Sequence, residues 1–142
     1  EFPYLNNIME HGEYVHIEKA GLKIYPEYGT YSDFNALPDS IFLYIADENN
    51  VVTDAVKDYL GKQVQGGKLV KDDLFLGNTY YYFDVTQFMK EELGASGKYK
   101  HNLQLVFNSD DYTKTLKNLT FSAPNGQNPI ILQLNYKIYE SY

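Results

Sequence analysis

A strict alternation of apolar and polar residues limits what this chain can fold into more than any other feature. In "LQLNYKI" (residues 132–138) every second residue is apolar or aromatic, and polar residues lie between them. The same alternation occurs in "EYVHIEK" (13–19) and "HNLQLVF" (101–107). Because successive side chains of a β-strand point to opposite faces, this period predicts strands with one buried face.

Other segments extend this pattern. "GLKIYP" (21–26) alternates as well, and a break at Ala20 and Gly21 is predicted to separate it from the strand before it. "SIFLYIA" (40–46) is apolar on both faces, which is typical of a central strand. A short strand is expected around 119–121. Residues 51–67 are predicted to be a loop with short helical or strand pieces, ended by the flexible "QGG".

Turn-forming residues separate these segments. The turns are predicted at "DENN" (47–50), "NSDD" (108–111) and "APNGQNP" (123–129), and "GASGKYK" (94–100) reads as a linker. Asp and Asn bond their own backbone and tolerate left-handed conformations, and Asn-Gly is a strong hairpin signal. The strands are therefore expected to follow one another in antiparallel order.

Residues 80–94, "YYYFDVTQFMKEELG", change period within one segment. Alternation places Tyr81 and Phe83 on one strand face, whereas Tyr80 and Tyr82 face the other way. From Val85 onward, apolar residues recur every three or four positions, which predicts one short helix near 85–93. We expect the inward rings to fill the core and the helix to close one end of it.

The ends of this helix carry recognisable signals. Asp84 and Gln87 have the spacing of a capping box, in which two side chains bond the free backbone groups of the first turn. Gly94 stands where a left-handed cap often ends a helix.

The whole pattern predicts an all-β fold, an antiparallel two-sheet β-sandwich that is jelly-roll-like and has this one short helix. At 142 residues, with 44% hydrophobic and 22% charged residues, the chain fits one globular domain spanning 1–142. Residues 1–12 are expected to be an irregular N-terminal arm. Because the chain begins at Glu1 without a methionine or an apolar signal segment, we expect it to be part of a longer precursor.

Charge and composition exclude several classes of partner and site. The formal net charge of -7 disfavours a nucleic-acid partner, which requires a concentrated positive surface. The chain has no cysteine, so it has no disulfide or thiolate site. It also has no run of about 20 apolar residues, which a membrane-spanning helix requires.

Catalytic and metal-binding patterns are weak. The three histidines, His11, His16 and His101, are scattered and have no ligand spacing. Residues 47–50 lack the continuation that an EF-hand calcium loop needs, and the 19 acidic residues do not single out a catalytic pair. We therefore predict no enzyme activity, no catalytic residues, no metal site and no cofactor.

Tyrosine, present 15 times, is the residue type with the clearest binding character. Outward rings on strands can form a platform on which sugar faces stack. The candidate ligand-binding residues are Tyr25, Tyr44, Tyr80, Tyr82 and Tyr139. The alternative is that these rings pack under loops or across strand pairs, since tyrosine suits strands.

Several motifs together resemble a known family. "YYYFDVTQFMKEEL", "NLQLVF", "LTFS" and "PIILQLNYKIY" are similar to the second half of a family of uncharacterised outer-membrane lipoproteins of the Bacteroidetes. "YVHIEKAGLKIYP" and "LPDSIFLYIADENN" resemble its earlier part, so the resemblance covers most of the chain. A looser similarity links the chain to jelly-roll sandwiches found beside bacterial surface enzymes.

This resemblance implies a secreted domain at the outer membrane or cell surface, held by a lipid anchor outside this chain, and it implies no activity. In such a host, Asp39-Ser40-Ile41 resembles a short O-glycosylation acceptor, which makes Ser40 a candidate modification site. The alternative is that Ser40 simply begins a strand.

Three functions follow from these observations. The first is a non-catalytic accessory or interaction domain of a surface lipoprotein, with another surface protein or a glycan as partner. The second is a carbohydrate-binding module that uses exposed tyrosines. The third is a pilus-like assembly subunit that donates the strand at residues 130–139 to a neighbour. An enzyme ranks last, and the oligomeric state is left open.

Overall fold

The structure is a computed structural model that describes residues 7–8, 15–58, 60–61, 64–74, 77–94, 101–107, 119–121 and 130–139. Seven strands and one short helix occupy these ranges. They are β1 (Val15–Ile24), β2 (Ser40–Ala46), β3 (Val52–Ala55), β4 (Gly66–Val70), β5 (Tyr80–Asp84), α2 (Thr86–Gly94), β6 (Asn102–Phe107) and β7 (Ile131–Ile138).

The seven strands form one antiparallel sheet. Its order is β3-β2-β4-β5-β1-β7, and β6 pairs with β2. The prediction of an antiparallel β-rich fold with one short helix is confirmed. The two separate sheets of a sandwich are not seen in the described residues, because β4 pairs with both β2 and β5 and joins the two halves.

The strand β4 begins at the end of region 51–67, which was predicted to be a loop with short helical or strand pieces. Its first residues, Gly66 and Gly67, belong to the sheet and pair with β2, so the prediction of a flexible "QGG" end was wrong. Residues 52–55 form the short strand β3, which pairs with the end of β2. The segment 40–46 is confirmed as a central strand, because β2 pairs with β3, β4 and β6.

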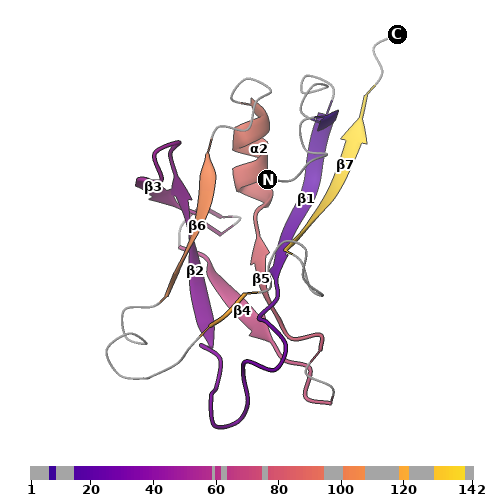
Figure 1. Cartoon of the computed structure of the whole chain (residues 1–142). Helices are drawn as coiled ribbons and strands as arrows, with labels where there is room; N and C mark the ends of the chain where they lie inside the picture. Colours follow the sequence, from indigo (N-terminus) through magenta and orange to yellow (C-terminus); the bar gives the residue numbers. More distant parts are fainter. Residues whose placement is uncertain are drawn as a thin grey trace.

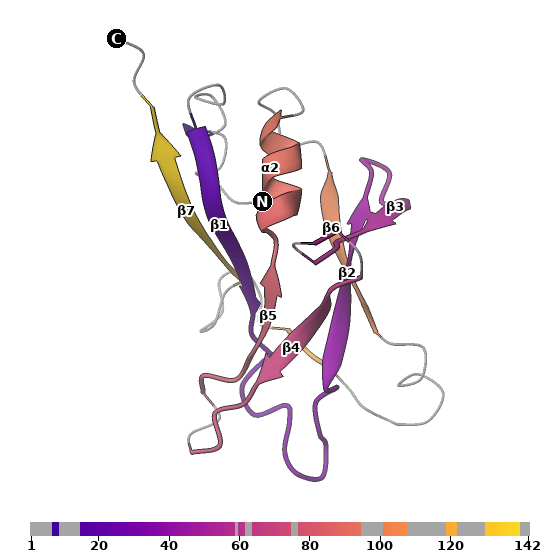
Figure 2. The ribbon, with the colours of Figure 1, turned by 180° about the vertical axis from the view of Figure 1, so that it is seen from behind.

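The sheet curves so that its two halves face each other (Figures 1 and 2). Strands β2 and β6 lie on one side, β1 and β7 lie on the other, and α2 stands between them at one end. The inward side chains of both halves and of α2 belong to a single hydrophobic core. Burying this apolar surface is the main favourable contribution to folding.

A β-bulge shapes β1. Ile17 pairs with Tyr136 and Lys19 pairs with Asn135, so Glu18 is an extra residue with no partner in β7. The bulge changes which residues face inward, from Val15 and Ile17 before it to Ala20, Leu22 and Ile24 after it. The predicted break at residues 20–21 was therefore wrong, because one bulged strand accounts for the same change of face.

The strand β5 agrees with the predicted division of its faces. Tyr81 and Phe83 are fully buried, whereas Tyr80 and Tyr82 are half-buried on the opposite face. The buried hydroxyl of Tyr81 donates a hydrogen bond of 2.6 Å to the Pro38 carbonyl, which satisfies its polar end. The crowded rings at residues 80–83 are therefore sorted to the two faces of the sheet.

The helix α2 begins differently from the prediction. The Asp84 carboxylate accepts hydrogen bonds from the N–H and the hydroxyl of Thr86, at 3.0 and 2.5 Å. Gln87 bonds Glu91 along the helix instead of completing a capping box. Gly94 is the last helical residue, and its φ is not positive, so the predicted left-handed cap is absent there.

Phe88 and Met89 of α2 are buried in the core, which confirms that the helix covers one end of it.

The turn at 47–50 is confirmed too, since the Asp47 carboxylate accepts hydrogen bonds from the N–H groups of Asn49 and Val51. In the described residues, no helix is long and apolar enough to cross a membrane.

Some predictions lie outside the described residues. They concern the arm at 1–12, apart from 7–8, the turns at 108–111 and 123–129, and most of the linker at 94–100. Around 119–121 the structure shows one isolated bridge, between Phe121 and Pro26.

Candidate functional site

A hollow of about 490 Å³ lies on the outer face of the sheet, over β4, β5, β1 and β7. We call it the tyrosine–lysine groove. Its lining residues are Lys19, Gly21, Lys23, Lys68, Val70, Tyr80, Tyr82, Gln133 and Asn135. The volume falls within the range of about 300–1,000 Å³ that is usual for small-molecule sites.

The register of the sheet arranges these residues in rows. Lys68, Tyr82 and Lys23 lie directly beside one another on β4, β5 and β1. In the other rows, Gly21 pairs with Gln133, and Lys19 pairs with Asn135. Residues that pair directly across strands share one face of the sheet, so these side chains project on the same side.

Glycine provides the floor of the groove. A Cβ on Gly21 would lie 2.9 Å from the Cε2 and hydroxyl oxygen of Tyr82, so the tyrosine ring occupies the space above this residue. A glycine inside a strand often marks such a close approach. The Tyr82 ring therefore packs against the backbone of Gly21 and remains half-buried.

Tyr80 is held by its neighbours at one end of the groove. Its ring lies 5.5 Å from that of Tyr25, with 49° between the ring planes, and the Lys23 ammonium lies 5.1 Å from its centre. The second contact is a cation–π interaction. Since Tyr25 and Tyr80 are tilted against each other, they do not form the flat platform that the sequence suggested.

The groove is positively charged. Of the described residues that line it, three are lysines and none is acidic, although the chain as a whole has a net charge of -7. Within the described part of the chain, Lys19, Lys23 and Lys68 have no carboxylate partner. Asp84, which pairs with Gly21 in the sheet, directs its carboxylate to Thr86.

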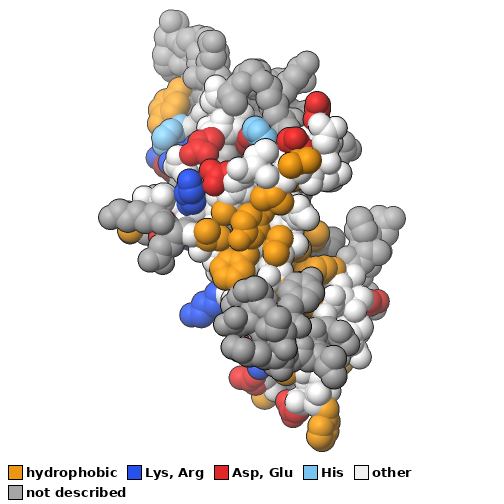
Figure 3. All heavy atoms as spheres, turned by 90° about the vertical axis from the view of Figure 1, so that its left-hand side faces the viewer, with side chains coloured by type: hydrophobic (Ala, Val, Ile, Leu, Met, Phe, Trp, Pro, Cys, Tyr) orange, Lys and Arg blue, Asp and Glu red, His pale blue; other side chains and the backbone are white. Residues whose placement is uncertain are grey.

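Two of the predicted tyrosines lie elsewhere. Tyr44 is half-buried on β2, and Tyr139 is 59% exposed just beyond β7. Figure 3 shows the side of the molecule that carries β2, β3 and β6, where hydrophobic side chains gather at mid-height. Of the five candidates, Tyr80 and Tyr82 line the groove, and Tyr25 contacts the ring of Tyr80 beside it.

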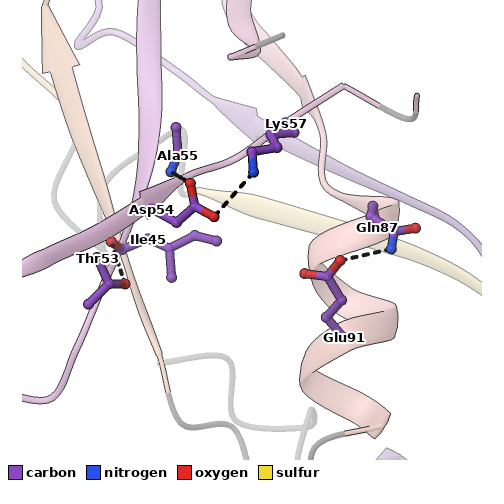
Figure 4. A network of polar contacts seen from close by, with 7 residues as sticks. All are labelled: Ile45, Thr53, Asp54, Ala55, Lys57, Gln87 and Glu91. Carbon is purple, nitrogen blue, oxygen red and sulfur yellow. Dashed lines mark hydrogen bonds and ion pairs between the residues drawn. The ribbon is translucent and has the colours of Figure 1, made fainter. Parts of the chain in front are cut away.

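A second hollow, of about 370 Å³, lies between β3 and α2. Figure 4 shows an Asp54–Lys57 ion pair of 3.3 Å on the strand side and a Gln87–Glu91 hydrogen bond of 2.8 Å on the helix. The Ala55 N–H and then Lys57 lower the pKa of Asp54. A general acid requires a raised pKa, so Asp54 is unsuited to that role.

The histidines are placed separately. His16 is exposed on β1, and His101 lies before β6, where its Nδ1 is 2.5 Å from the buried Glu92 carboxylate. His11 lies outside the described residues. Among the residues that the structure describes, no three His, Asp or Glu side chains form a group suited to a metal ion.

Two further predicted features have defined positions. Ser40 is half-buried as the first residue of β2, and Asp39 before it is exposed. The segment predicted to be a donor strand is β7, which pairs along its length with β1 of its own sheet. Donation of this strand to a neighbour would require that ladder to open.

The sequence did not indicate five residues of the groove: Lys19, Lys23, Lys68, Gln133 and Asn135. Lys23, Gln133 and Asn135 had been interpreted as ordinary polar positions opposite the core, and no role had been predicted for Lys19 or Lys68. The available signal was that lysines share strand faces with outward tyrosines, but only the register shows which of them become neighbours.

In comparisons with known proteins, no protein-family model, no curated protein and no solved structure matches this chain.

Proposed function

We propose that this chain is a non-catalytic binding domain that holds a sugar ligand in the tyrosine–lysine groove. The observation that carries this proposal is the half-buried ring of Tyr82 at the centre of a hollow of about 490 Å³. Sugar faces stack on aromatic rings, and sugar hydroxyls both donate and accept hydrogen bonds. The amides of Gln133 and Asn135 offer both donors and acceptors.

The rigidity of the site supports the same function. Tyr82 lies across Gly21, and Tyr80 is held between Tyr25 and Lys23. Rings that are already fixed lose little conformational freedom when a ligand binds, so more of the interaction energy appears as affinity. The residues also lie on four paired strands rather than on loops, which keeps their spacing constant.

The resemblance to Bacteroidetes lipoproteins supports a wider setting for this function. In that setting, the domain is an accessory module at the outer membrane or cell surface, held by a lipid anchor outside this chain. A jelly-roll-like sandwich is the fold favoured by the strand pattern and by the looser similarity to bacterial jelly-roll sandwiches, and it stays part of this proposal. The partner is a glycan, and no reaction is catalysed on it.

The test compares two tyrosine variants. Tyr82→Ala should weaken glycan binding at least about tenfold, equivalent to 1.4 kcal/mol, because the stacking surface is lost. Tyr139→Ala removes an exposed ring outside the groove and should bind as the unmodified protein does. A glycan array identifies ligands, and isothermal titration calorimetry measures the affinities.

Equal binding by both variants would place the ligand outside the groove. Absence of binding to every glycan would reject a sugar ligand altogether. The same glycans should be recovered uncut after incubation with the protein, and cleavage would contradict the non-catalytic part of the proposal.

A further inference from the structure

We propose that the ligand of the tyrosine–lysine groove is an acidic glycan, whose carboxylate or sulfate groups bind the groove lysines. This inference rests on the proposed function and adds the chemical class of the ligand. It starts from the lysines, which a neutral sugar would not require.

The distribution of charge is the first argument. Among the residues that the structure describes, three lysines line this one hollow and no acidic residue does. In a chain with 19 acidic residues, this produces a local positive region on a negatively charged molecule. A hollow lined by one sign of charge concentrates the electric field and attracts ligands of the opposite sign.

The positions of the lysines are the second argument. Lys68 and Lys23 lie on either side of Tyr82 in the same row of the sheet. Neighbouring strands are about 4.8 Å apart, so the Cα atoms of the two lysines are about 10 Å apart. A sugar stacked on Tyr82 therefore places an acidic substituent within reach of one ammonium group or the other.

The state of these ammonium groups is the third argument. Lys23 lies against the Tyr80 ring, which positions its charge without neutralising it. By contrast, Lys57 and Lys137 are paired with Asp54 and Glu18 outside the groove. Among the described residues, the groove lysines have no carboxylate partner and can bind an anionic ligand, whereas these two lysines are already paired within the protein.

The experiment uses matched pairs of ligands that differ only in charge. The first pair is an oligogalacturonate hexamer and its methyl ester, and the second is sulfated cellohexaose and cellohexaose. A uridine hexanucleotide tests whether any aromatic polyanion binds equally well. Affinities are measured by calorimetry at low and high salt for the intact chain and for two variants.

The variants also form a matched pair. Lys68→Gln removes a charge from the groove, and Lys90→Gln removes the same charge from an exposed position on α2. At low salt, at least one acidic ligand should bind about tenfold or more tightly than its uncharged counterpart. Added salt and Lys68→Gln should each remove much of this preference, while Lys90→Gln should keep it.

The outcomes separate this inference from the proposed function. If charged and uncharged ligands bind equally and Tyr82→Ala abolishes binding of both, the site binds sugars but the acidic ligand class is rejected. If Lys68→Gln and Lys90→Gln have equal effects, the groove lysines are not the determinant. Tighter binding of the hexanucleotide than of both acidic sugars would reject a glycan as the ligand, and binding of no sugar would reject both proposals.

Discussion

At the residue scale, Gly67 shows how the sheet accommodates the crowded rings of β5. It pairs with Ile41 of β2, and the Phe83 ring of β5 lies against it on the face that points into the core. A Cβ at this position would lie 2.1 Å from Cζ of Phe83, so the phenyl ring fills the space that a side chain would need. Gly21 has the same relation to Tyr82 on the opposite face.

Gly67→Ala should therefore destabilise the protein. Overpacking a core usually costs about 1–3 kcal/mol, because side chains and backbone must shift to accept the new methyl group. The neighbouring glycine is a matched control: a Cβ on Gly66 would be 3.6 Å from the Phe42 ring, an ordinary contact distance. Gly66→Ala should change the free energy of unfolding by no more than about 0.5 kcal/mol.

Urea denaturation of the two variants measures both values. Similar stabilities for Gly67→Ala and Gly66→Ala would show that Phe83 does not occupy the space above Gly67. The difference between the two glycines is invisible in the sequence, where the pair resembles a flexible doublet. The requirement for glycine comes from a ring that approaches from another strand.

At the element scale, the junction of β5 and α2 depends on a side chain that replaces strand pairing. Gln65 accepts a hydrogen bond from the Asp84 N–H and donates one of 2.7 Å to the Asp84 carbonyl. On the other side, Val85 and Thr86 continue the bonding to Ala20 of β1. Backbone groups at the end of β5 are thereby satisfied as the chain turns into the helix.

Gln65→Ala should cost about 1–3 kcal/mol of unfolding free energy, because it leaves two part-buried backbone groups of Asp84 without partners. Gln104 of β6 is an exposed glutamine on a strand, and Gln104→Ala should change stability by no more than about 0.5 kcal/mol. Chemical denaturation compares the two. An effect of Gln65→Ala as small as that of Gln104→Ala would mean that water replaces the glutamine at no cost.

An ion pair between β1 and β7 forms at the bulge of β1. Glu18, the unpaired residue of the bulge, accepts a hydrogen bond from Lys137 of β7. This hydrogen bond, and then the positive charge of Lys137, lower the pKa of Glu18 below its ordinary value of 4.5. The pair is exposed, so its contribution to stability is expected to be small.

Lys137→Gln should raise the pKa of Glu18 towards its ordinary value, and carboxyl chemical shifts in an NMR titration measure it. Because the folded-state pKa is the lower one, the stabilisation is present above the unfolded-state value of 4.5. It is lost as the pH falls through the folded-state pKa. Any stability difference between the variant and the unmodified protein should therefore disappear in acid, and an unchanged pKa would show that the pair does not form in solution.

At the scale of the whole molecule, curvature decides the architecture. The alternating pattern predicted two layers enclosing a core, and the inward faces of β1, β2 and β5 are buried as expected. One continuous sheet achieves this because β4 connects the halves. That strand was not recognised, since "GGKLV" has two glycines and little apolar alternation.

The candidate site is also a property of the whole molecule. Tyr80 and Tyr82 were chosen correctly as outward residues, because their direction follows from the pleat of a single strand. Tyr44 and Tyr139 have the same local pattern but lie away from the groove. Distance along the chain gives no indication of which outward side chains will meet.

The sequence alone determined which face each side chain takes within a strand, because the alternation is built into the geometry of an extended backbone. Only the tertiary structure decided that Lys68, Tyr82 and Lys23 stand in one row, since pairing between distant strands sets their register. Buried positions such as Leu43, Tyr81 and Phe83 could therefore be predicted from the alternation, whereas Tyr136 and Ile138 of β7 remain exposed and the groove exists only in the assembled sheet.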